Sequence, residues 1–450
     1  MQDKYRTAFS DRVDPAHFEM AFRTEEEALQ FLKSEYDKAR WKHLGRFHLY
    51  GSIPMHYQLP KYKDIVADCA QVQRKKGECC RQRPILPYTD HPLRNVYRRG
   101  GKALAAIVRS LPPGQFDIDR VSSVRDAILQ ANAKAIAEYG RGNYRWISLV
   151  GDLSCMYDEL DPSVAVERVT DSCGQLPDWL GKRKARLAGV SMGWNSKLAV
   201  MGKPTSDNKV FLQFDDLVSL CSLDCGQTLY SLEGKVNRRR FGVPMGGFMS
   251  PQLARLYCAT TELGMVRPPG LSSLVGFENR YMDDIFAVYA VRLDHPEDEQ
   301  VVRQWFKVIE TSYPDPLYLT VEEESTQARF LELLIDTSGD EITCCLYNPV
   351  VEGQGIPRLP HWFGGETMAE RQARLIGQIH RVTEGSSHKW CVIRGVCGMM
   401  AEVRCSQWPM GMLVRALQAY GHHCSGEKLW QSEVDTLGRT LILLLSDNPF

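Results

Sequence analysis

The spacing of apolar residues predicts amphipathic helices in the first third of the chain. Thr24 is a suitable N-cap for a helix over 25–40, because its hydroxyl can accept hydrogen bonds from the amides of the first turn. Apolar residues at a period of 3.6 predict two further helices, over 92–110 and 122–139. Before them, the two prolines within 83–87 predict an extended or turn segment.

Short runs of β-forming residues predict the strands of a buried sheet. The run from Arg145 to Asp152 is apolar and ends on a carboxylate, which is typical of a buried strand. Two more apolar runs, 274–277 and 285–291, flank the sequence Tyr-Met-Asp-Asp at 281–284. This arrangement predicts two strands joined by a tight acidic turn.

The rest of the chain alternates helices with short strands. The further expected elements are helices over 214–225, 251–263, 297–312, 367–383, 388–404 and 410–420, a hairpin over 228–234 and two strands within 317–346. Between Asp161 and Lys209, clusters of Gly, Pro, Lys and Arg weaken the pattern, so we expect an insertion of variable structure. The alternation predicts an α+β fold, and 450 residues are enough for two or three subdomains.

The composition is that of an ordinary globular protein, with 44% hydrophobic and 24% charged residues. No apolar run approaches the roughly 20 residues that a membrane span needs. Neither secretion nor membrane insertion is therefore expected. The 14 cysteines form no Cys-x-x-Cys arrangement, which favours reduced thiols and a nuclear or cytoplasmic location.

The distribution of charge changes what the net charge suggests. A formal net charge of zero argues against a nucleic-acid binder, because phosphate contacts usually require an excess of Lys and Arg. However, the stretch 61–109 contains twelve Lys or Arg residues against four Asp or Glu residues, whereas acidic residues dominate 292–341. The first stretch could therefore bind a polyanion.

Three aspartates are the candidate catalytic groups. Asp152 ends one predicted strand, and Asp283 and Asp284 form the turn between two others. Magnesium prefers oxygen ligands, and a pair of such ions about 3.5–4 Å apart can stabilise both oxygens of a phosphoryl displacement. An Asp-Asp pair is also common at solvent-exposed turns, and the pair at 215–216 is interpreted in that way.

Several segments together resemble the motifs of reverse transcriptases. The sequence Tyr-Met-Asp-Asp-Ile-Phe-Ala-Val-Tyr at 281–289 resembles their catalytic turn, and Asp-Leu-Ser-Cys-Met-Tyr at 152–157 resembles their first acidic motif. The glycine-rich loop 242–251 is similar to the loop that contacts nucleotide and template. Three short sequences resemble those of Penelope-like elements, which are related to telomerase catalytic subunits. They are Leu-Pro-Lys at 59–61, Pro-Met-Gly at 244–246 and Phe-Leu-Glu-Leu at 330–333.

This resemblance implies a right-hand polymerase fold whose palm is an antiparallel sheet packed on helices. The implied regions are an N-terminal extension over 1–48, fingers over 49–145, a palm over 146–348 with an inserted finger-like segment about 161–235, and a helical thumb over 349–450. The implied activity is RNA-directed DNA polymerisation. Its partners would be an RNA template, a DNA primer and deoxynucleoside triphosphates.

The resemblance also assigns roles to individual residues. Asp152 and Asp283 would bind two Mg²⁺ ions, with Mn²⁺ as an alternative, and Asp284 would support them. Tyr157 would exclude a 2′ hydroxyl beneath the incoming sugar. The other implied nucleotide-binding residues are Lys61, Lys63, Arg83, Pro244, Met245 and Gly246.

Two other functions stay open at this point. Asp158, next to Tyr157, could accept a 2′ hydroxyl as in an RNA-dependent RNA polymerase. A domesticated, non-catalytic polymerase fold that binds nucleic acid is the second alternative. The stretch between Asp152 and Pro244 is also longer than is usual for the family, and no lysine within 319–324 can serve as proton donor to pyrophosphate.

Overall fold

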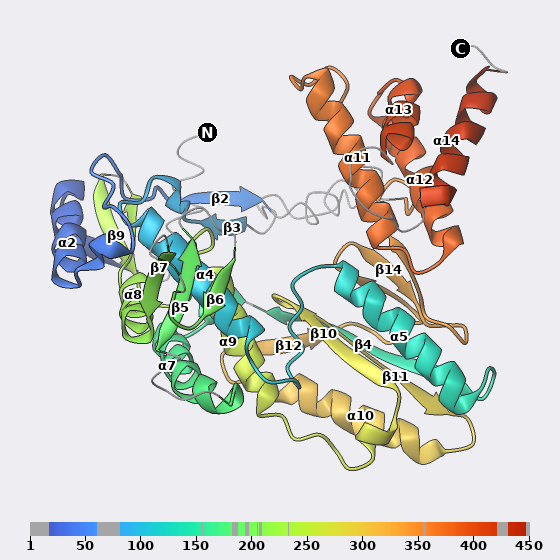
Figure 1. Ribbon diagram of the computed structural model, residues 1–450, viewed down its shortest axis with the longest axis horizontal. Coiled ribbons are helices and arrows are strands. Elements are labelled where there is room, and N and C mark those ends of the chain that lie inside the picture. Colours follow the sequence, from blue (N-terminus) through green and yellow to red (C-terminus); the bar gives the residue numbers. More distant parts are fainter. Residues whose placement is uncertain are drawn as a thin grey trace, which may run out of the picture. The chain divides into compact units, whose positions relative to one another are not determined.

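A computed structural model describes most of the chain (Figure 1). The described residues are 18–60, 82–154, 156–181, 188–193, 198–204, 206, 209–232, 234–353, 357–420 and 431–446. The chain divides into two compact units. The first unit comprises Met1–Asp117, Leu153–Met265 and Thr311–Leu319, and the second comprises Ile118–Asp152, Val266–Glu310 and Thr320–Phe450.

Helices form the centre of the first unit. The four that pack on one another are α4 (Arg94–Arg109), α7 (Pro162–Trp179), α8 (Phe214–Gly226) and α9 (Ser250–Leu263). Helix α7 begins where Asp161 accepts hydrogen bonds from the amides of Ser163 and Val164, with Pro162 at its first turn. The expectation of variable structure over 161–209 was therefore wrong for its first half.

Three small antiparallel sheets accompany these helices. Their orders are β1-β9-β8 (Phe18–Phe22, Lys235–Arg239, Thr228–Leu232), β6-β5-β7 (Ala199–Met201, Gly189–Gly193, Lys209–Gln213) and the ribbon β2-β3 (Tyr57–Pro60, Gln82–Ile85). Helix α2 (Glu25–Lys38) begins as expected at Thr24, whose hydroxyl accepts from the Glu27 amide at 3.2 Å. The sheet β6-β5-β7 corrects the second half of the expectation for 161–209.

A four-stranded sheet organises the second unit. Its order is β10-β11-β4-β12, with bounds Gly276–Tyr281, Asp284–Arg292, Tyr144–Ser154 and Tyr318–Val321. Helix α5 (Ser122–Tyr139) covers one face, where Ile128 and Ala135 pack with Phe286 and Val288 in one buried cluster. Helix α10 (Pro296–Thr311) also runs along this sheet (Figure 1).

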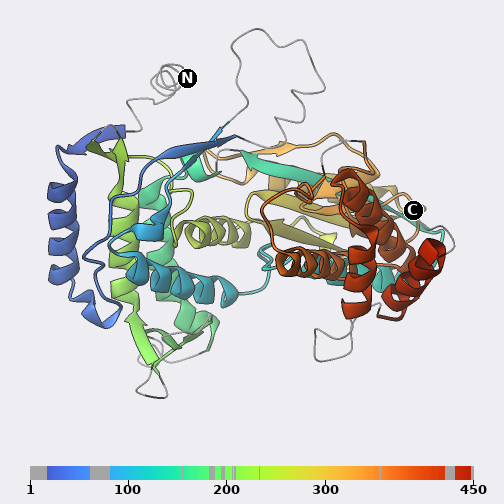
Figure 2. The ribbon, with the colours of Figure 1, turned by 90° about the horizontal axis from the view of Figure 1, so that it is seen from above.

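Two further parts complete the second unit. A three-stranded sheet, β13-β14-β15, has bounds Gln327–Phe330, Leu333–Asp336 and Thr343–Leu346. The helices that follow form a bundle (Figures 1 and 2), with bounds α11 Met368–Glu384, α12 Lys389–Cys405, α13 Met410–Tyr420 and α14 Gln431–Ser446. The bundle has its own buried core of aliphatic side chains, including Leu375, Val392 and Leu413.

The predicted mixture of helices with antiparallel sheets is confirmed. Within the described part of the chain, no helix is long and apolar enough to cross a bilayer.

Candidate active site

A two-residue turn joins strands β10 and β11 at the acidic motif. Tyr281 pairs with Asp284 across the hairpin, which leaves Met282 and Asp283 as the turn. Met282 has φ 57°, in the left-handed region, where a side chain with a Cβ is strained by about 1–2 kcal/mol. Glycine or asparagine usually takes such a position. Because the hairpin keeps a methionine there, the surrounding structure must hold the turn in this conformation.

The register of the sheet brings the two acidic motifs together. Strand β11 pairs antiparallel with β4, and Asp284 lies directly opposite Asp152. Directly opposite residues have Cα atoms about 4.5–5.5 Å apart and side chains on the same face. Asp283 adjoins this pair in the turn. The structure therefore brings together all three aspartates predicted from the sequence.

These carboxylates mark the point where a buried strand reaches the surface. Residues 285–291 of β11 are all buried, whereas Asp283 and Asp284 are half-buried and Asp152 is exposed. Like charges directly opposite one another destabilise a strand pair. A divalent cation bound between the carboxylates would turn this repulsion into attraction.

The donor set fits magnesium by its chemistry. Carboxylate oxygens are preferred ligands of Mg²⁺, which also keeps waters and takes substrate phosphate oxygens. Among the residues that the structure describes, no group of three or more His, Cys, Asp or Glu side chains is arranged to hold a metal ion. The fit therefore rests on the register of Asp152 with Asp284 and on the place of Asp283 in the turn.

A buried arginine supports the turn, and the sequence reasoning missed it. Arg280 precedes Tyr281 on β10 and is 0% exposed. Its Nη1 donates a hydrogen bond to the carbonyl oxygen of Met282 at 3.0 Å, and its own carbonyl oxygen accepts from the Ile118 amide at 2.9 Å. The signal in the sequence was a cation directly before the acidic motif.

In the first unit, the glycine-rich loop packs on the backbone of Tyr157. Tyr157 lies in the short helix α6 (Met156–Glu159), and the Val243 amide donates to its carbonyl oxygen at 2.9 Å. Gly242 has φ 72°, and a Cβ there would lie 2.4 Å from the same oxygen. Only glycine permits this approach. The proposed steric gate and the loop thus form one local structure.

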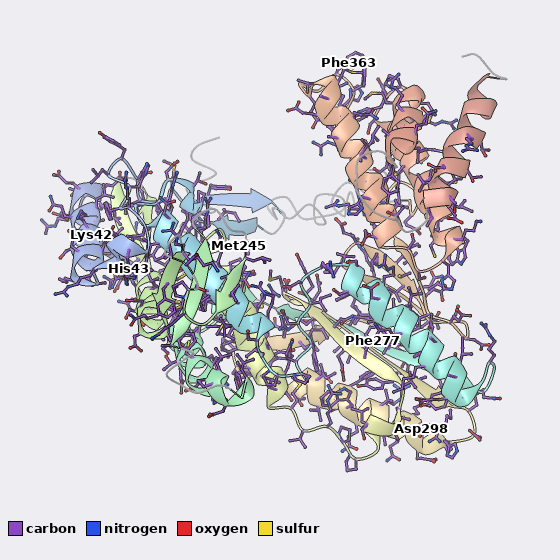
Figure 3. The ribbon with its side chains drawn as sticks, in the orientation of Figure 1. Lys42, His43, Met245, Phe277, Asp298 and Phe363 are labelled. Carbon is purple, nitrogen blue, oxygen red and sulfur yellow. The ribbon has the colours of Figure 1, made fainter. Side chains whose placement is uncertain are left out.

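The same loop also contacts the segment that follows Arg83. The Leu86 amide donates to the carbonyl oxygen of Met245 at 2.8 Å. Gly246 has φ 112°, and a Cβ there would lie 2.6 Å from the Leu86 carbonyl oxygen. Pro244 is buried, Met245 (labelled in Figure 3) is half-buried and Gly246 is exposed. Three segments assigned to nucleotide binding therefore meet in the first unit.

Helix α4 supports the loop through two glycines that the sequence reasoning did not single out. A Cβ on Gly101 would lie 2.3 Å from the carbonyl oxygen of Phe248, and one on Gly100 would lie 2.3 Å from the sulfur of Met249. Arg98 of the same helix lies over the Phe248 ring, 5.1 Å from its centroid. The loop is thus packed against a helix through contacts that admit no larger side chains.

The structure places the other residues singled out in the sequence as follows. Lys61 and Lys63 lie outside the described residues. The backbone of Arg83 lies in β3, opposite Leu59. The Asp pair at 215–216 lies in the first turn of helix α8 and not in a solvent-exposed turn between elements; carboxylates there interact favourably with the helix dipole.

Asp158 has an ion pair that bears on the RNA-polymerase alternative. Its Oδ1 accepts a hydrogen bond from Nη2 of Arg239 at 2.8 Å, and Arg239 is buried. The same guanidinium donates to the carbonyl oxygen of Tyr157 at 3.3 Å. The Asp158 carboxylate therefore helps to fix α6 against β9, a structural use that the sequence reasoning did not anticipate.

Comparison with known proteins adds a likeness of fold. No protein-family model and no curated protein sequence matches the chain. A structure of telomerase from Candida albicans, in complex with the TWJ fragment of telomeric RNA, has a TM-score of 0.54 and 12% identity, and covers 92% of this chain and 68% of that one. The chain therefore has a fold similar to that of this telomerase structure. A telomerase structure from Candida tropicalis, also with the TWJ fragment, has a TM-score of 0.44 and 10% identity over 94% of this chain and 65% of that one.

Proposed function

We propose that this chain is an RNA-directed DNA polymerase, similar to telomerase-related and Penelope-like reverse transcriptases. The observation that carries the proposal is the placement of Asp152 directly opposite Asp284, with Asp283 in the adjoining turn. The telomerase-like fold supports the same class of enzyme. Since the similar telomerase was solved with RNA, an RNA template is the first partner proposed; a DNA primer and deoxynucleoside triphosphates complete the set.

The aspartates have distinct proposed roles. Asp152 and Asp283 would each offer carboxylate oxygens to both Mg²⁺ ions, or to Mn²⁺ in their place, and Asp284 would reinforce the negative charge from the opposite strand. Bound there, the ions would stabilise the attacking and leaving oxygens of nucleotidyl transfer. The protein's own contribution would be to hold the three aspartates in a fixed register at the end of one sheet.

Residues outside the acidic turn have proposed roles in binding the nucleotide. Tyr157, fixed by the loop through its own carbonyl oxygen, is proposed to select a sugar without a 2′ hydroxyl. Met245 and Gly246 would position the base pair together with Pro244. Lys61, Lys63 and Arg83 would bind the triphosphate, for which Arg offers a planar fork of donors.

The regions of a right-hand polymerase can be proposed on this basis. The sheet β10-β11-β4-β12 would be the palm and helices α11 to α14 the thumb. The fingers would come from 49–145 with the inserted segment about 161–235, after an N-terminal extension over 1–48. Action on nucleic acid would place the protein in the nucleus or the cytoplasm.

Primer extension on an RNA template with deoxynucleotides tests the proposal. Asp152→Asn and Asp283→Asn should each lower the rate by at least about 10³-fold, because each removes an anionic metal ligand. Asp215→Asn is the matched control, since Asp215 is also one of a pair of aspartates but lies in the first turn of α8. It should change the rate less than about twofold.

Three outcomes would contradict the proposal. The first is equal extension by wild type and Asp283→Asn. The second is preferential incorporation of ribonucleotides, which would favour the RNA-polymerase alternative. The third is RNA binding without any extension, which would favour a non-catalytic polymerase fold.

A further inference from the structure

Two large apolar side chains are exposed at the tip of a tight turn in the first unit. The Gly51 amide donates to the carbonyl oxygen of His48 at 2.9 Å, which makes Leu49 and Tyr50 the central residues of a β-turn. Leu49 is 74% exposed and Tyr50 is 93% exposed. Central turn positions usually carry Gly, Pro, Asn, Asp or Ser. An exposed Leu-Tyr pair at this position therefore requires an explanation other than turn formation.

The turn is fixed at both ends to one underlying segment. The His48 amide donates to the Pro92 carbonyl oxygen at 2.9 Å, and the Ser52 amide donates to that of Asp90, also at 2.9 Å. A Cβ on Gly51 would lie 2.8 Å from the Asp90 carbonyl oxygen, so the turn rests directly on this segment. The tyrosine is therefore presented on a constrained backbone, which lowers the entropy cost of a contact.

Buried aromatic rings stabilise the segment beneath the turn. Tyr88, in the 3₁₀ helix η2 (Tyr88–Asp90), stacks on His91 with ring centroids 4.7 Å apart. Both rings are buried, and Tyr97 of α4 packs against each of them. The support of the turn is thus part of the core of the first unit.

The charge around the turn is positive. From Ala39 to Pro60 the chain contains three Lys or Arg residues, three His residues and no Asp or Glu. The three cations, Arg40, Lys42 and Arg46, are exposed, and none forms an ion pair with a residue that the structure describes. Figure 3 labels Lys42 and His43 in this region.

Acids from neighbouring elements also contact this region. Glu25 of α2 accepts a hydrogen bond from the Ile53 amide at 2.7 Å, and Asp90 lies 3.9 Å from Nη1 of Arg94. Asp216 of α8 lies 3.7 Å from His43. The net charge of 39–60 is positive, which complements a polyanion and opposes a basic protein surface.

We infer that the His48–Gly51 turn is a contact site for single-stranded nucleic acid, in which a base stacks on Tyr50 and Leu49 while Arg46 and Lys42 contact phosphates. Aromatic stacking platforms beside cations are the usual means of binding single strands without reading sequence. The chain then continues through Met55 and Tyr57, which are 72% and 44% exposed, into β2 and on to Lys61. The inference takes its class of ligand from the proposed function.

The experiment measures binding of labelled oligothymidylate by fluorescence anisotropy in EDTA, so that metal-dependent chemistry plays no part. Tyr50→Ser should weaken binding about 5- to 100-fold, the range for loss of one stacked base, whereas Tyr50→Phe should stay within about twofold. Met20→Ser is the control: Met20 lies in β1, is also a large apolar side chain that is exposed (56%), and has no proposed contact with nucleic acid, so its replacement should leave the affinity unchanged.

A second probe separates stacking from charge. An abasic oligomer of the same length has the same phosphates without bases, so wild type and Tyr50→Ser should bind it equally. Arg46→Gln should weaken binding to both oligomers. The slope of the logarithm of the binding constant against the logarithm of salt concentration should become smaller by about one, because one phosphate contact is lost.

Two results would overturn the inference. One is unchanged binding of oligothymidylate by Tyr50→Ser. The other is that Tyr50→Ser changes the self-association of the protein or its binding to other proteins but leaves its binding to nucleic acid unchanged. The turn would then be a protein-binding surface. The Asp283→Asn variant keeps the two proposals separable: if it binds like wild type in EDTA, its loss of extension reports on catalysis alone.

Discussion

The guanidinium of Arg280 donates a hydrogen bond to the carbonyl oxygen of Met282, the residue whose left-handed conformation opens the acidic turn. The cation is fully buried and lies one residue before Tyr281. It thus holds the strained residue that precedes Asp283, and we assign Arg280 as a positioning residue for the proposed reaction.

Arg280→Lys should keep the charge but lose the reach and planar geometry of the guanidinium. We expect kcat for primer extension to fall about 10- to 100-fold, because small misplacements of reacting groups have costs of this size. The KM for the deoxynucleotide should change little, and the Mg²⁺ concentration for half-maximal rate should rise. A variant with lower thermal stability but wild-type Mg²⁺ dependence would reduce Arg280 to a purely structural role.

Asp152→Asn should stabilise the metal-free protein while it abolishes extension. The substitution removes the repulsion between directly opposite carboxylates, a gain of about 0.5 kcal/mol in the free energy of unfolding. Urea denaturation in EDTA measures this gain, which should shrink at high salt because Asp152 is exposed. Added Mg²⁺ should then stabilise the wild type and not the variant; equal responses would count against a cation site here.

Gly242→Ala should be much more damaging than Gly234→Ala. Both glycines have positive φ, at 72° and 77°, so both variants carry backbone strain of about 1 kcal/mol. Among the described residues other than its chain neighbours, no atom lies within 4 Å of a Cβ added at Gly234. At Gly242 the Cβ would lie 2.4 Å from the Tyr157 carbonyl oxygen. We expect a total loss of about 3 kcal/mol or more in urea denaturation and a raised nucleotide KM for Gly242→Ala. Similar losses in both variants would show that the contact with Tyr157 is unimportant.

The buried carboxyl of Asp224 should make the first unit less stable as pH rises. Burial raises its pKa to about 7, against about 3.9 in an unfolded chain. Between these values the folded state keeps a proton that the unfolded state has released, so the free energy of unfolding falls with increasing pH. His91 acts in the opposite sense over an overlapping range, because burial lowers its pKa to about 3.

Asp224→Asn isolates the contribution of Asp224 to the pH dependence, because His91 is unchanged in the variant. Relative to wild type, the variant should gain stability between about pH 4 and pH 7 and level off above. Urea denaturation across this range measures the difference. If the difference in the free energy of unfolding between variant and wild type does not depend on pH, Asp224 titrates alike in the folded and the unfolded state.

The sequence could predict elements whose signals are local. Helix α2 was found from its cap at Thr24, and α11 has a full capping box between Thr367 and Glu370. Strand β11 was found because nearly all of its residues are apolar, and β4 because it contains a run of β-forming apolar residues. The three aspartates were found because each one ends an apolar strand or lies where two such strands join; they are Asp152, Asp283 and Asp284.

Elements whose signals are tertiary were missed. Helix α7 contains Gly174 and Pro177, which weaken a helical pattern, and its stability comes from packing on α8 and α9. The strand β1 is paired through Phe18 with Arg239, far along the chain, and nothing in either sequence specifies that partner. Arg280 was missed because a hydrogen bond to a neighbouring carbonyl oxygen leaves no periodic pattern.

The ladder between β4 and β11 also limits how this protein can vary in length. Asp284 pairs with Asp152, and the pairing continues without a shift to Arg292 opposite Tyr144. Inserting or deleting one residue within either strand would move every following side chain to the other face and separate the two carboxylates. Over evolutionary time, insertions in a lineage that keeps this chemistry should therefore accumulate outside these two strands, as in the long stretch between Asp152 and Pro244.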